Sequence, residues 1–296
     1  YALSLSDLVL AGIIPSNAAR SGGVILPIAR SIAELYGSSP GATAAVLGSF
    51  LMTAVYQSIC VTASMFLTGQ ASNPQVAQIA TEQFQYPVSW TSWFLVGIVP
   101  GLFSMALVPL LVYRVNPPQI KRTPEAARFA AKGLHGMGPM SRGESIVLVV
   151  FVTVCGLWLT QFVHGLDITV TALLGAAMLL VSGVLTWEDV KNERAAWDIL
   201  IWYGGLLMLG RALNEAGVTT QFARAVGAAF GGAGWVTLFA IALLIYFYAH
   251  YGFASITAHI MAMYAPFVAV LIAKDAPKGL ILFAFACFTN LAAGLT

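Results

Sequence analysis

Two short polar segments, residues 16–20 and 255–259, carry side chains that could hold an anion. The first reads Ser-Asn-Ala-Ala-Arg and the second reads Ser-Ile-Thr-Ala-His, so both follow the pattern Ser-x-small-Ala-basic. Hydroxyl and amide groups donate hydrogen bonds, and Arg20 and His259 add positive charge beside them. Because a dicarboxylate has two charged ends, the two segments predict a site that holds one carboxylate at each.

The stretches beside each polar segment are apolar and predict two helical hairpins. In the first, even residues 1–15 would form a helix only about 22 Å long, shorter than the roughly 30 Å hydrocarbon core. Its second arm covers residues 24–36, and the later hairpin has arms at 235–251 and 260–273. Helices that begin inside the membrane leave backbone N–H groups unsatisfied, and these groups favour carboxylates. We therefore expect two re-entrant hairpins with anion-binding tips.

The composition predicts an all-α integral membrane protein. Hydrophobic residues make up 59% of the chain and charged residues 9%, whereas soluble domains carry about 25% charged residues. With a net charge of +2 and no basic stripe, the expected surroundings are a lipid bilayer and not nucleic acid. The cysteines and histidines have no metal-ligand spacing, so we expect no metal and no cofactor. The chain starts and stops within its apolar pattern, which indicates part of a longer protein.

Longer apolar segments predict spanning helices at 41–67, 90–113, 145–163, 166–185, 198–213 and from 279 onward. Two of them should break on small polar residues, at 68–74 and 289–296. The residues expected to line a site at these breaks are Thr68, Gly69, Ser72, Asn73, Thr289 and Asn290. The loop 114–143 carries six basic residues and one acidic residue, Glu125, and should be cytoplasmic.

A hairpin followed by a broken helix occurs twice, and the span count places the two hairpin mouths on opposite sides of the membrane. This arrangement predicts an inverted-topology repeat with a binding site near the midplane. The corresponding domains are a transport segment at 1–75, scaffold spans at 76–233 and a second transport segment at 234–296. Two alternatives stay open: Arg20 could reach lipid headgroups from a helix end, and His259 could be a hydrogen-bonded interior histidine.

The stretches "SNAARSGGVILPI" and "ASITAHIMAMYAPF" resemble the divalent anion/sodium symporter family, also called DASS or INDY. In that family a Ser-Asn-Thr motif occupies each hairpin tip and a sodium ion sits beside it. Here Ala18 stands where the first motif has Thr, and Ile256 stands where the second has Asn. With Arg20 and His259 added, the chain resembles the exchanger branch that includes citrate/succinate and 2-oxoglutarate/malate antiporters.

The resemblance implies an elevator-type homodimeric transporter for di- or tricarboxylates, and no enzyme activity. The implied substrate-binding positions are Ser16, Asn17, Ala18, Ser255, Ile256 and Thr257, and the side chains of Arg20 and His259 would stand where sodium ions otherwise bind. A tethered cation cannot leave with its substrate, so an empty carrier would hold an uncompensated charge and exchange would be obligatory. The implied location is a bacterial cytoplasmic membrane or a plastid envelope.

Three other functions are compatible with parts of the pattern. A sodium-coupled dicarboxylate symporter has the same fold, but Arg20 and His259 argue against it. A passive anion channel would need no counter-substrate. An intramembrane hydrolase could use Ser255 with His259 or His250, but no Gly-x-Ser-x-Gly elbow surrounds that serine.

Overall fold

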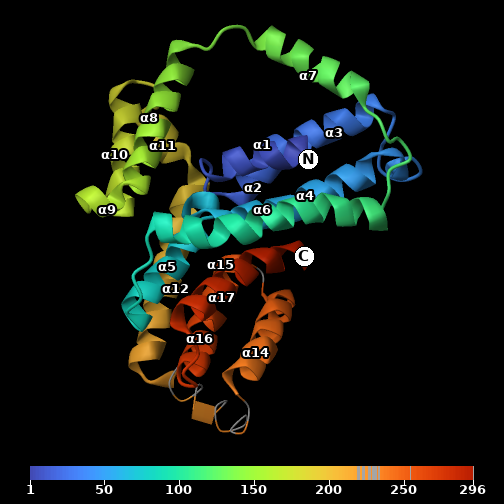
Figure 1. Cartoon of the computed structure of the whole chain (residues 1–296). Helices are drawn as coiled ribbons and strands as arrows, with labels where there is room; N and C mark the ends of the chain where they lie inside the picture. Colours follow the sequence, from blue (N-terminus) through green and yellow to red (C-terminus); the bar gives the residue numbers. More distant parts are fainter. Residues whose placement is uncertain are drawn as a thin grey trace. The chain divides into compact units, whose positions relative to one another are not determined.

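The computed structural model describes residues 1–218, 221, 224–225, 228, 232, 234–253 and 255–295. Over these residues the regular secondary structure is helical and no strand is present (Figure 1). Contacts divide the chain into two units: unit 1 holds residues 1–13, 18–59 and 104–193, and unit 2 holds residues 14–17, 60–103 and 194–296. The predicted all-α fold is confirmed. The predicted domain limits at residues 75 and 233 concern motion and stay a prediction, and much of 219–233 lies outside the described residues.

Unit 1 contains most of the first hairpin. Its elements are α1 (Ala2–Ala11), the tip helix α2 (Asn17–Arg20), the π-turn η1 (Ser21–Ile25) and α3 (Leu26–Leu35). Helical structure is continuous from the tip to the end of α3, so the second arm starts seven residues earlier than the predicted residue 24. Ile25 and Ala29 of this run pack with Val55 and Ile59 of α4 (Gly48–Met65) in a buried apolar cluster.

The rest of unit 1 follows α4 and the last part of α6 (Trp90–Val115). It comprises α7 (Pro124–Met137), α8 (Arg142–Leu159), α9 (Gln161–His164), α10 (Ile168–Val181) and α11 (Trp187–Asn192). Helix α7 lies within the loop that the sequence predicted as a plain connection. It starts at Pro124, where a missing N–H costs no hydrogen bond. Helix α8 starts with a capping box, in which Ser141 and Glu144 exchange side-chain and backbone hydrogen bonds.

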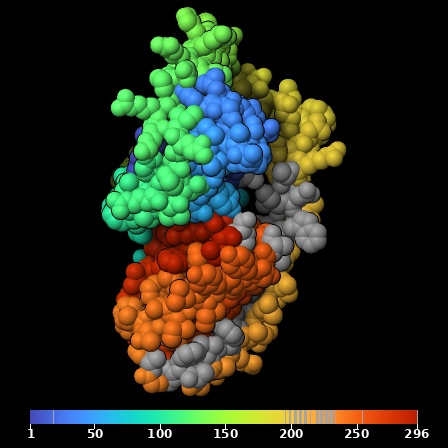
Figure 2. All heavy atoms as spheres, turned by 90° about the vertical axis from the view of Figure 1, so that its right-hand side faces the viewer, coloured from blue at the N-terminus to red at the C-terminus, as the bar shows by residue number. Residues whose placement is uncertain are grey.

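Unit 2 contains the second hairpin and both helices that were expected to break. Its elements are η3 (Leu67–Gly69), α5 (Ser72–Phe84), the start of α6, α12 (Arg194–Glu215), α14 (Trp235–Ala249), η4 (His250–Gly252), α15 (Ile256–His259), η5 (Ile260–Tyr264), α16 (Ala265–Ile272), α17 (Lys278–Ala292) and η6 (Ala293–Leu295). Helix α14 packs against α16 and α17, and Figure 2 shows their residues, in orange and red, as one close-packed group. The side chains of Tyr246, Tyr264 and Phe285 fill the middle of this group and are completely buried.

Four helices of the described part are long and apolar enough to cross a membrane. They are Trp90–Val115, Arg142–Leu159, Trp235–Gly252 and Lys278–Leu295. Large apolar side chains on α6, such as Leu95, Val99 and Phe103, are exposed. Exposed apolar side chains along spanning helices suit contact with lipid tails, so the chain is an integral membrane protein, as predicted.

Candidate functional site

The two predicted tips have the same local structure. In each, a serine is followed by a four-residue helix that ends on the basic residue, then by a five-residue π-turn, then by a helix with proline at its second position. The prolines are Pro27 and Pro266, and the basic residues are Arg20 and His259. π-Turns are rare and often occur at functional sites. Equal spacing of serine, cation, π-turn and proline therefore supports a structural repeat.

In unit 1, Arg20 forms a buried ion pair with Asp7 of α1. Its Nε donates to Oδ1 of Asp7 over 2.6 Å, and the side chains are 0% and 1% exposed. The alternative in which Arg20 reaches out to lipid headgroups does not fit this geometry. The sequence reasoning assigned the anionic partner of Arg20 to a substrate, whereas the chain itself supplies one. Asp7 was missed, although a lone acidic residue in an apolar hairpin arm is a signal that could have identified it.

Asn17, three residues before Arg20, belongs to unit 2 and contacts the first broken helix. Asn17 donates from Nδ2 to Oε1 of Gln70 over 2.8 Å, and the Gln70 amide donates to Ser72 Oγ over 2.8 Å. Gln70 is buried and has an extended backbone between η3 and α5. It was not among the predicted site residues, yet it joins the predicted residues Asn17 and Ser72.

The break between α4 and α5 confirms the predicted discontinuity and depends on two residues. A Cβ on Gly69 would lie 2.6 Å from the carbonyl oxygen of Ala63, so this close turn requires glycine. Asn73 donates from Nδ2 to the carbonyl oxygens of Ala63 and Phe66 over 2.8 and 2.9 Å. These carbonyls lie at the end of α4 and just beyond it, where the helix cannot satisfy them itself. Thr68, also predicted, accepts a hydrogen bond from the indole of Trp90 over 3.3 Å.

The second helix continues further than predicted. Helix α17 runs through Thr289 and Asn290 to Ala292 and becomes a 3₁₀ turn only at Ala293–Leu295. Both polar side chains bond carbonyls one turn back, at Phe285 and Ala286, so they remain within the helix instead of breaking it.

The two helices that follow the hairpins are joined by a pair of asparagines. Asn290 donates from Nδ2 to Oδ1 of Asn73 over 2.9 Å, and both side chains are buried. The residues are 217 positions apart and come from corresponding parts of the two repeats. Oδ1 of Asn290 is buried without a hydrogen-bond partner. The structure thus brings together Asn73 and Asn290, which the sequence predicted separately.

The second tip in unit 2 places its basic residue in an aromatic cluster. His259 is completely buried, and its ring lies 4.2 Å from the ring of Tyr246, with Phe253 at 5.2 Å and His250 at 5.3 Å between ring centroids. The carbonyl of Tyr246 interacts with His259, but neither ring nitrogen has a hydrogen bond of ordinary geometry. Its complete burial agrees with the alternative of an interior histidine, and its polar contact is with the carbonyl of Tyr246.

Tyr246 connects this cluster to helix α17. Its hydroxyl lies 2.6 Å from Oγ1 of Thr289, and Thr289 donates its only proton to the carbonyl of Phe285 over 2.7 Å. The tyrosine hydroxyl must therefore be the donor to Thr289. Tyr246 was not among the predicted site residues, because an aromatic residue in an apolar arm looks like ordinary core.

The other predicted tip residues lie at the surface or partly covered. Ser255 is exposed, and its Oγ accepts the N–H of Ala258, which caps α15. Ser16, Asn17, Ile256 and Thr257 are half-buried, and nothing is described of the Ala18 side chain. In the part of the chain that the structure describes, this cap is the hydrogen bond of Ser255 Oγ, and none joins it to the ring of His259 or His250 as nucleophile and base would be joined. Among the described residues, no three His, Cys, Asp or Glu side chains gather as a metal site would require.

The two hairpins have matching tips. Each hairpin is followed by a helix, and these two helices contact each other at a pair of buried asparagines. Such features define a class of helical membrane transporters built from repeats. The chain belongs to the family described as the sodium:sulfate symporter transmembrane region, whose model matches residues 1–296. This family is the one that the tip motifs resemble, so the predicted resemblance is confirmed.

Several curated relatives align over nearly the whole chain. The putative malate transporter YflS of Bacillus subtilis is 44% identical over 98% of this chain and 61% of the relative. The chloroplastic dicarboxylate transporter 1 of Spinacia oleracea is 40% identical over 100% of this chain and 52% of the relative. The inner membrane protein YbhI of Escherichia coli is 34% identical over 94% of this chain and 58% of the relative. The chain therefore spans about half to three-fifths of the length of these relatives.

Proposed function

We propose that the intact protein exchanges dicarboxylates, and tricarboxylates of similar shape, across a membrane. The observation that carries this proposal is the pair of completely buried basic side chains, Arg20 and His259, at equivalent positions of two matching tips. Relatives named as malate and dicarboxylate transporters support the substrate class. A carboxylate would bind at each tip, where a helical run starts with short polar residues: Ser16 and Asn17 at one, Ser255 and Thr257 at the other.

At the first tip, we propose that Arg20 is a fixed replacement for a dissociable ion and that Asp7 holds it in place. An unpaired guanidinium at membrane depth is unfavourable by several kcal/mol, and the carboxylate of Asp7 removes that penalty. The pair is close to neutral, so the first tip adds little barrier to movement of an empty carrier. This differs from the sequence-based reasoning, in which Arg20 itself would be uncompensated without substrate.

At the second tip, we propose that protonated His259 is the charge that prevents the empty carrier from moving. None of the ion pairs formed by described residues involves His259. The face of the Tyr246 ring supports the charged imidazole in the way an aromatic ring supports a cation. A substrate carboxylate neutralises the imidazolium, and the loaded carrier can then move. Obligatory exchange follows at a pH where His259 stays protonated, because its side chain, unlike a sodium ion, cannot leave with the substrate.

We further propose that both hairpins and the helices after them move as one body, in an elevator-type motion within a homodimer. The contact between Asn73 and Asn290 supports shared movement of the two helices that follow the hairpins, because it joins them within one unit.

A sodium-coupled symporter is the second candidate, and one observation favours it. Oδ1 of Asn290 is a buried acceptor without a hydrogen-bond partner, and an amide oxygen is a suitable ligand for a hard cation. The family description itself names sodium.

Counterflow in proteoliposomes separates the two candidates. The full-length protein is reconstituted, and uptake of labelled malate is measured with and without internal malate and with and without sodium. Arg20→Ala is compared with Arg30→Ala, since Arg30 lies on the same hairpin but is exposed and paired with Glu34. Exchange predicts sodium-independent uptake that requires internal malate and is lost in Arg20→Ala alone. Uptake that depends on sodium and not on internal substrate would support the symporter.

A further inference from the structure

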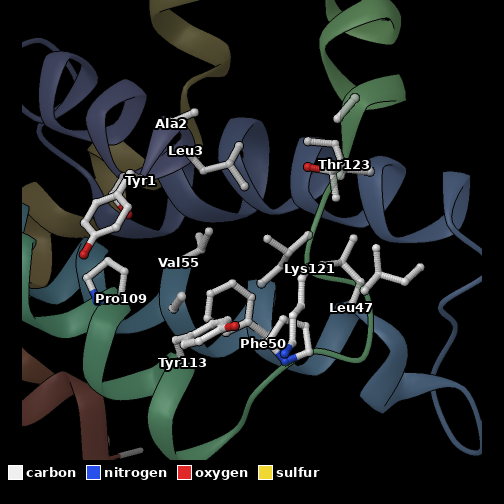
Figure 3. Close-up of a pocket in the computed structure, with 17 residues that line it drawn as sticks. Tyr1, Ala2, Leu3, Leu47, Phe50, Val55, Pro109, Tyr113, Lys121 and Thr123 are labelled. Atoms are coloured by element: carbon white, nitrogen blue, oxygen red, sulfur yellow. The ribbon is translucent and has the colours of Figure 1, made fainter.

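Unit 1 contains a cavity of about 290 Å³ that the transport proposal does not use (Figure 3). It lies between α1, α3, α4, the last turns of α6 and residues 118–126. Its walls are apolar and aromatic, and Lys121 is the one charged residue among the described residues that line it. Ligand pockets range from about 300 to 1,000 Å³ and are mostly apolar with a few polar groups, so this cavity is at the small end of that class.

The cavity lies beside the last turns of the spanning helix α6 and continues just past the end of that helix. Near one end, Tyr1 donates from its hydroxyl to the carbonyl of Ala106 over 2.8 Å. Helix α6 ends at Val115, nine residues or about 14 Å further along, and Lys121 follows it. The cavity is therefore apolar beside the last turns of α6 and has a cation, Lys121, just beyond the end of that helix. This order matches that of the acyl chain and the headgroup in a lipid.

The segment that carries the cation is held firmly against the rest of unit 1. The N–H groups of Gln119 and Ile120 donate to the carbonyls of residues 45 and 46 over 3.3 and 3.1 Å. The hydroxyl of Tyr36, directly after α3, accepts the N–H groups of Glu125 and Ala126 over 3.0 and 3.2 Å, which ties the start of α7 to the hairpin. These contacts fix the position of the segment that carries Lys121 against the hairpin and the turn before α4.

We propose that this cavity binds one anionic phospholipid, with an acyl chain along the apolar wall and the phosphate at Lys121. Charge complementarity selects an anionic headgroup: Arg122 follows Lys121 directly, and Glu125 is the one acidic residue between 114 and 142. Basic pockets between membrane helices bind anionic headgroups, and each cation near such a surface strengthens binding by about fivefold, or about 1 kcal/mol.

Native mass spectrometry of the full-length protein tests this site independently of transport. The protein is incubated with phosphatidylglycerol or phosphatidylcholine carrying identical acyl chains, and the retained lipid is counted. The wild type should retain phosphatidylglycerol in preference to phosphatidylcholine. Lys121→Gln should lower this preference about fivefold. Lys132→Gln is the matched control, because Lys132 is exposed on the same basic stretch but does not line the cavity.

Two variants test whether the cavity itself is the site. Ala54→Phe places a ring in the cavity from its α4 wall, and Thr123→Trp fills it from the start of α7 without changing the helix interior. Either variant, if folded, should reduce retention of both lipids. Equal loss of preference in Lys121→Gln and Lys132→Gln would overturn the proposal, as would unchanged retention in the two filled variants. Absence of retained lipid on the wild type would also overturn it, since another part of the chain would then fill the cavity.

Discussion

The guanidinium of Arg20 donates from Nε to Oδ1 of Asp7 across 2.6 Å, with both side chains almost completely buried. Arg20 sits at the end of the first tip helix and Asp7 in the arm before it, 13 residues earlier. The pair fixes a cation at the tip without leaving an unbalanced charge in the membrane. In the proposed mechanism the two basic residues have separate tasks: Arg20 is a held cation, and His259 is the charge that changes with loading.

Removing one partner of this ion pair should destabilise the protein strongly. Asp7→Asn leaves a buried guanidinium without its carboxylate, and the expected loss of unfolding free energy is about 3–5 kcal/mol. Arg20→Met should cost a similar amount, and the double variant should cost less than the sum, because neither charge is then stranded. The measurement is thermal unfolding of the full-length protein in detergent. Glu34→Gln, which breaks the exposed pair with Arg30, is the control and should change stability by less than about 1 kcal/mol. Additive effects in the double variant would contradict the pairing.

The contact between Asn73 and Asn290 should contribute less to the free energy of unfolding than the ion pair does. Removing the Asn73 side chain and removing the Asn290 side chain should have unequal costs. Asn290→Ala removes the hydrogen bond to Asn73 and the longer one to the carbonyl of Ala286, at an expected cost of about 1–3 kcal/mol for the buried groups left unpaired. Asn73→Ala also removes the bonds to the carbonyls of Ala63 and Phe66 and should cost more, although Phe66 keeps the N–H of Gly69. Asn192→Ala, on an exposed helix end, provides the comparison. Equal costs at positions 73 and 290 would show that the cap on α4 is unimportant.

Gly69 should tolerate no side chain. Gly69→Ala would place a methyl group 2.6 Å from the carbonyl oxygen of Ala63, so the backbone of the break must shift. We expect exchange activity to fall at least tenfold while the protein still reaches the membrane. Gly156→Ala, in α8 where nothing lies within 4 Å of an added Cβ, should keep full activity. Normal exchange by Gly69→Ala would mean that the tight turn is not needed for function.

Tyr246 should act through its ring and its hydroxyl in separable ways. Tyr246→Phe keeps the face over His259 and removes the donor to Thr289, so we expect a stability loss of about 1 kcal/mol with exchange retained. Tyr246→Leu removes the aromatic face as well and should lower the exchange rate further. Rates measured at equal protein density in vesicles provide the test. Identical rates for the Phe and Leu variants would exclude a role for the ring in supporting the charged imidazole.

The hairpins, their basic tips and the first break could be predicted from the sequence, because polar residues inside apolar runs are conspicuous. Glycine and asparagine at positions 69 and 73 are such signals. Helix α7 was missed because its amphipathic pattern lies within a basic segment whose composition is typical of a solvent-exposed loop. The break after α17 was predicted too early in the chain. The side chains of Thr289 and Asn290 donate hydrogen bonds to carbonyls one turn back, so both residues remain in the helix.

Long-range partners could not be predicted. Asp7 meets Arg20, Gln70 meets Asn17, and Tyr246 meets His259 only after the chain has folded. No local periodicity carries that information. Of these partners, Asp7 gave a usable sign as an isolated charge in an apolar arm, and Gln70 lies within the predicted break at 68–74.

The most direct test of the proposed exchange is sodium-free uptake of labelled malate into proteoliposomes that contain either malate or no substrate. The wild type and His164→Gln, a change at an exposed histidine, should take up malate only into the loaded vesicles. His259→Gln removes the fixed charge and should narrow the difference between loaded and empty vesicles. Equal uptake by the wild type into loaded and empty vesicles, or uptake that begins only when sodium is added, would contradict a tethered cation as the cause of obligatory exchange.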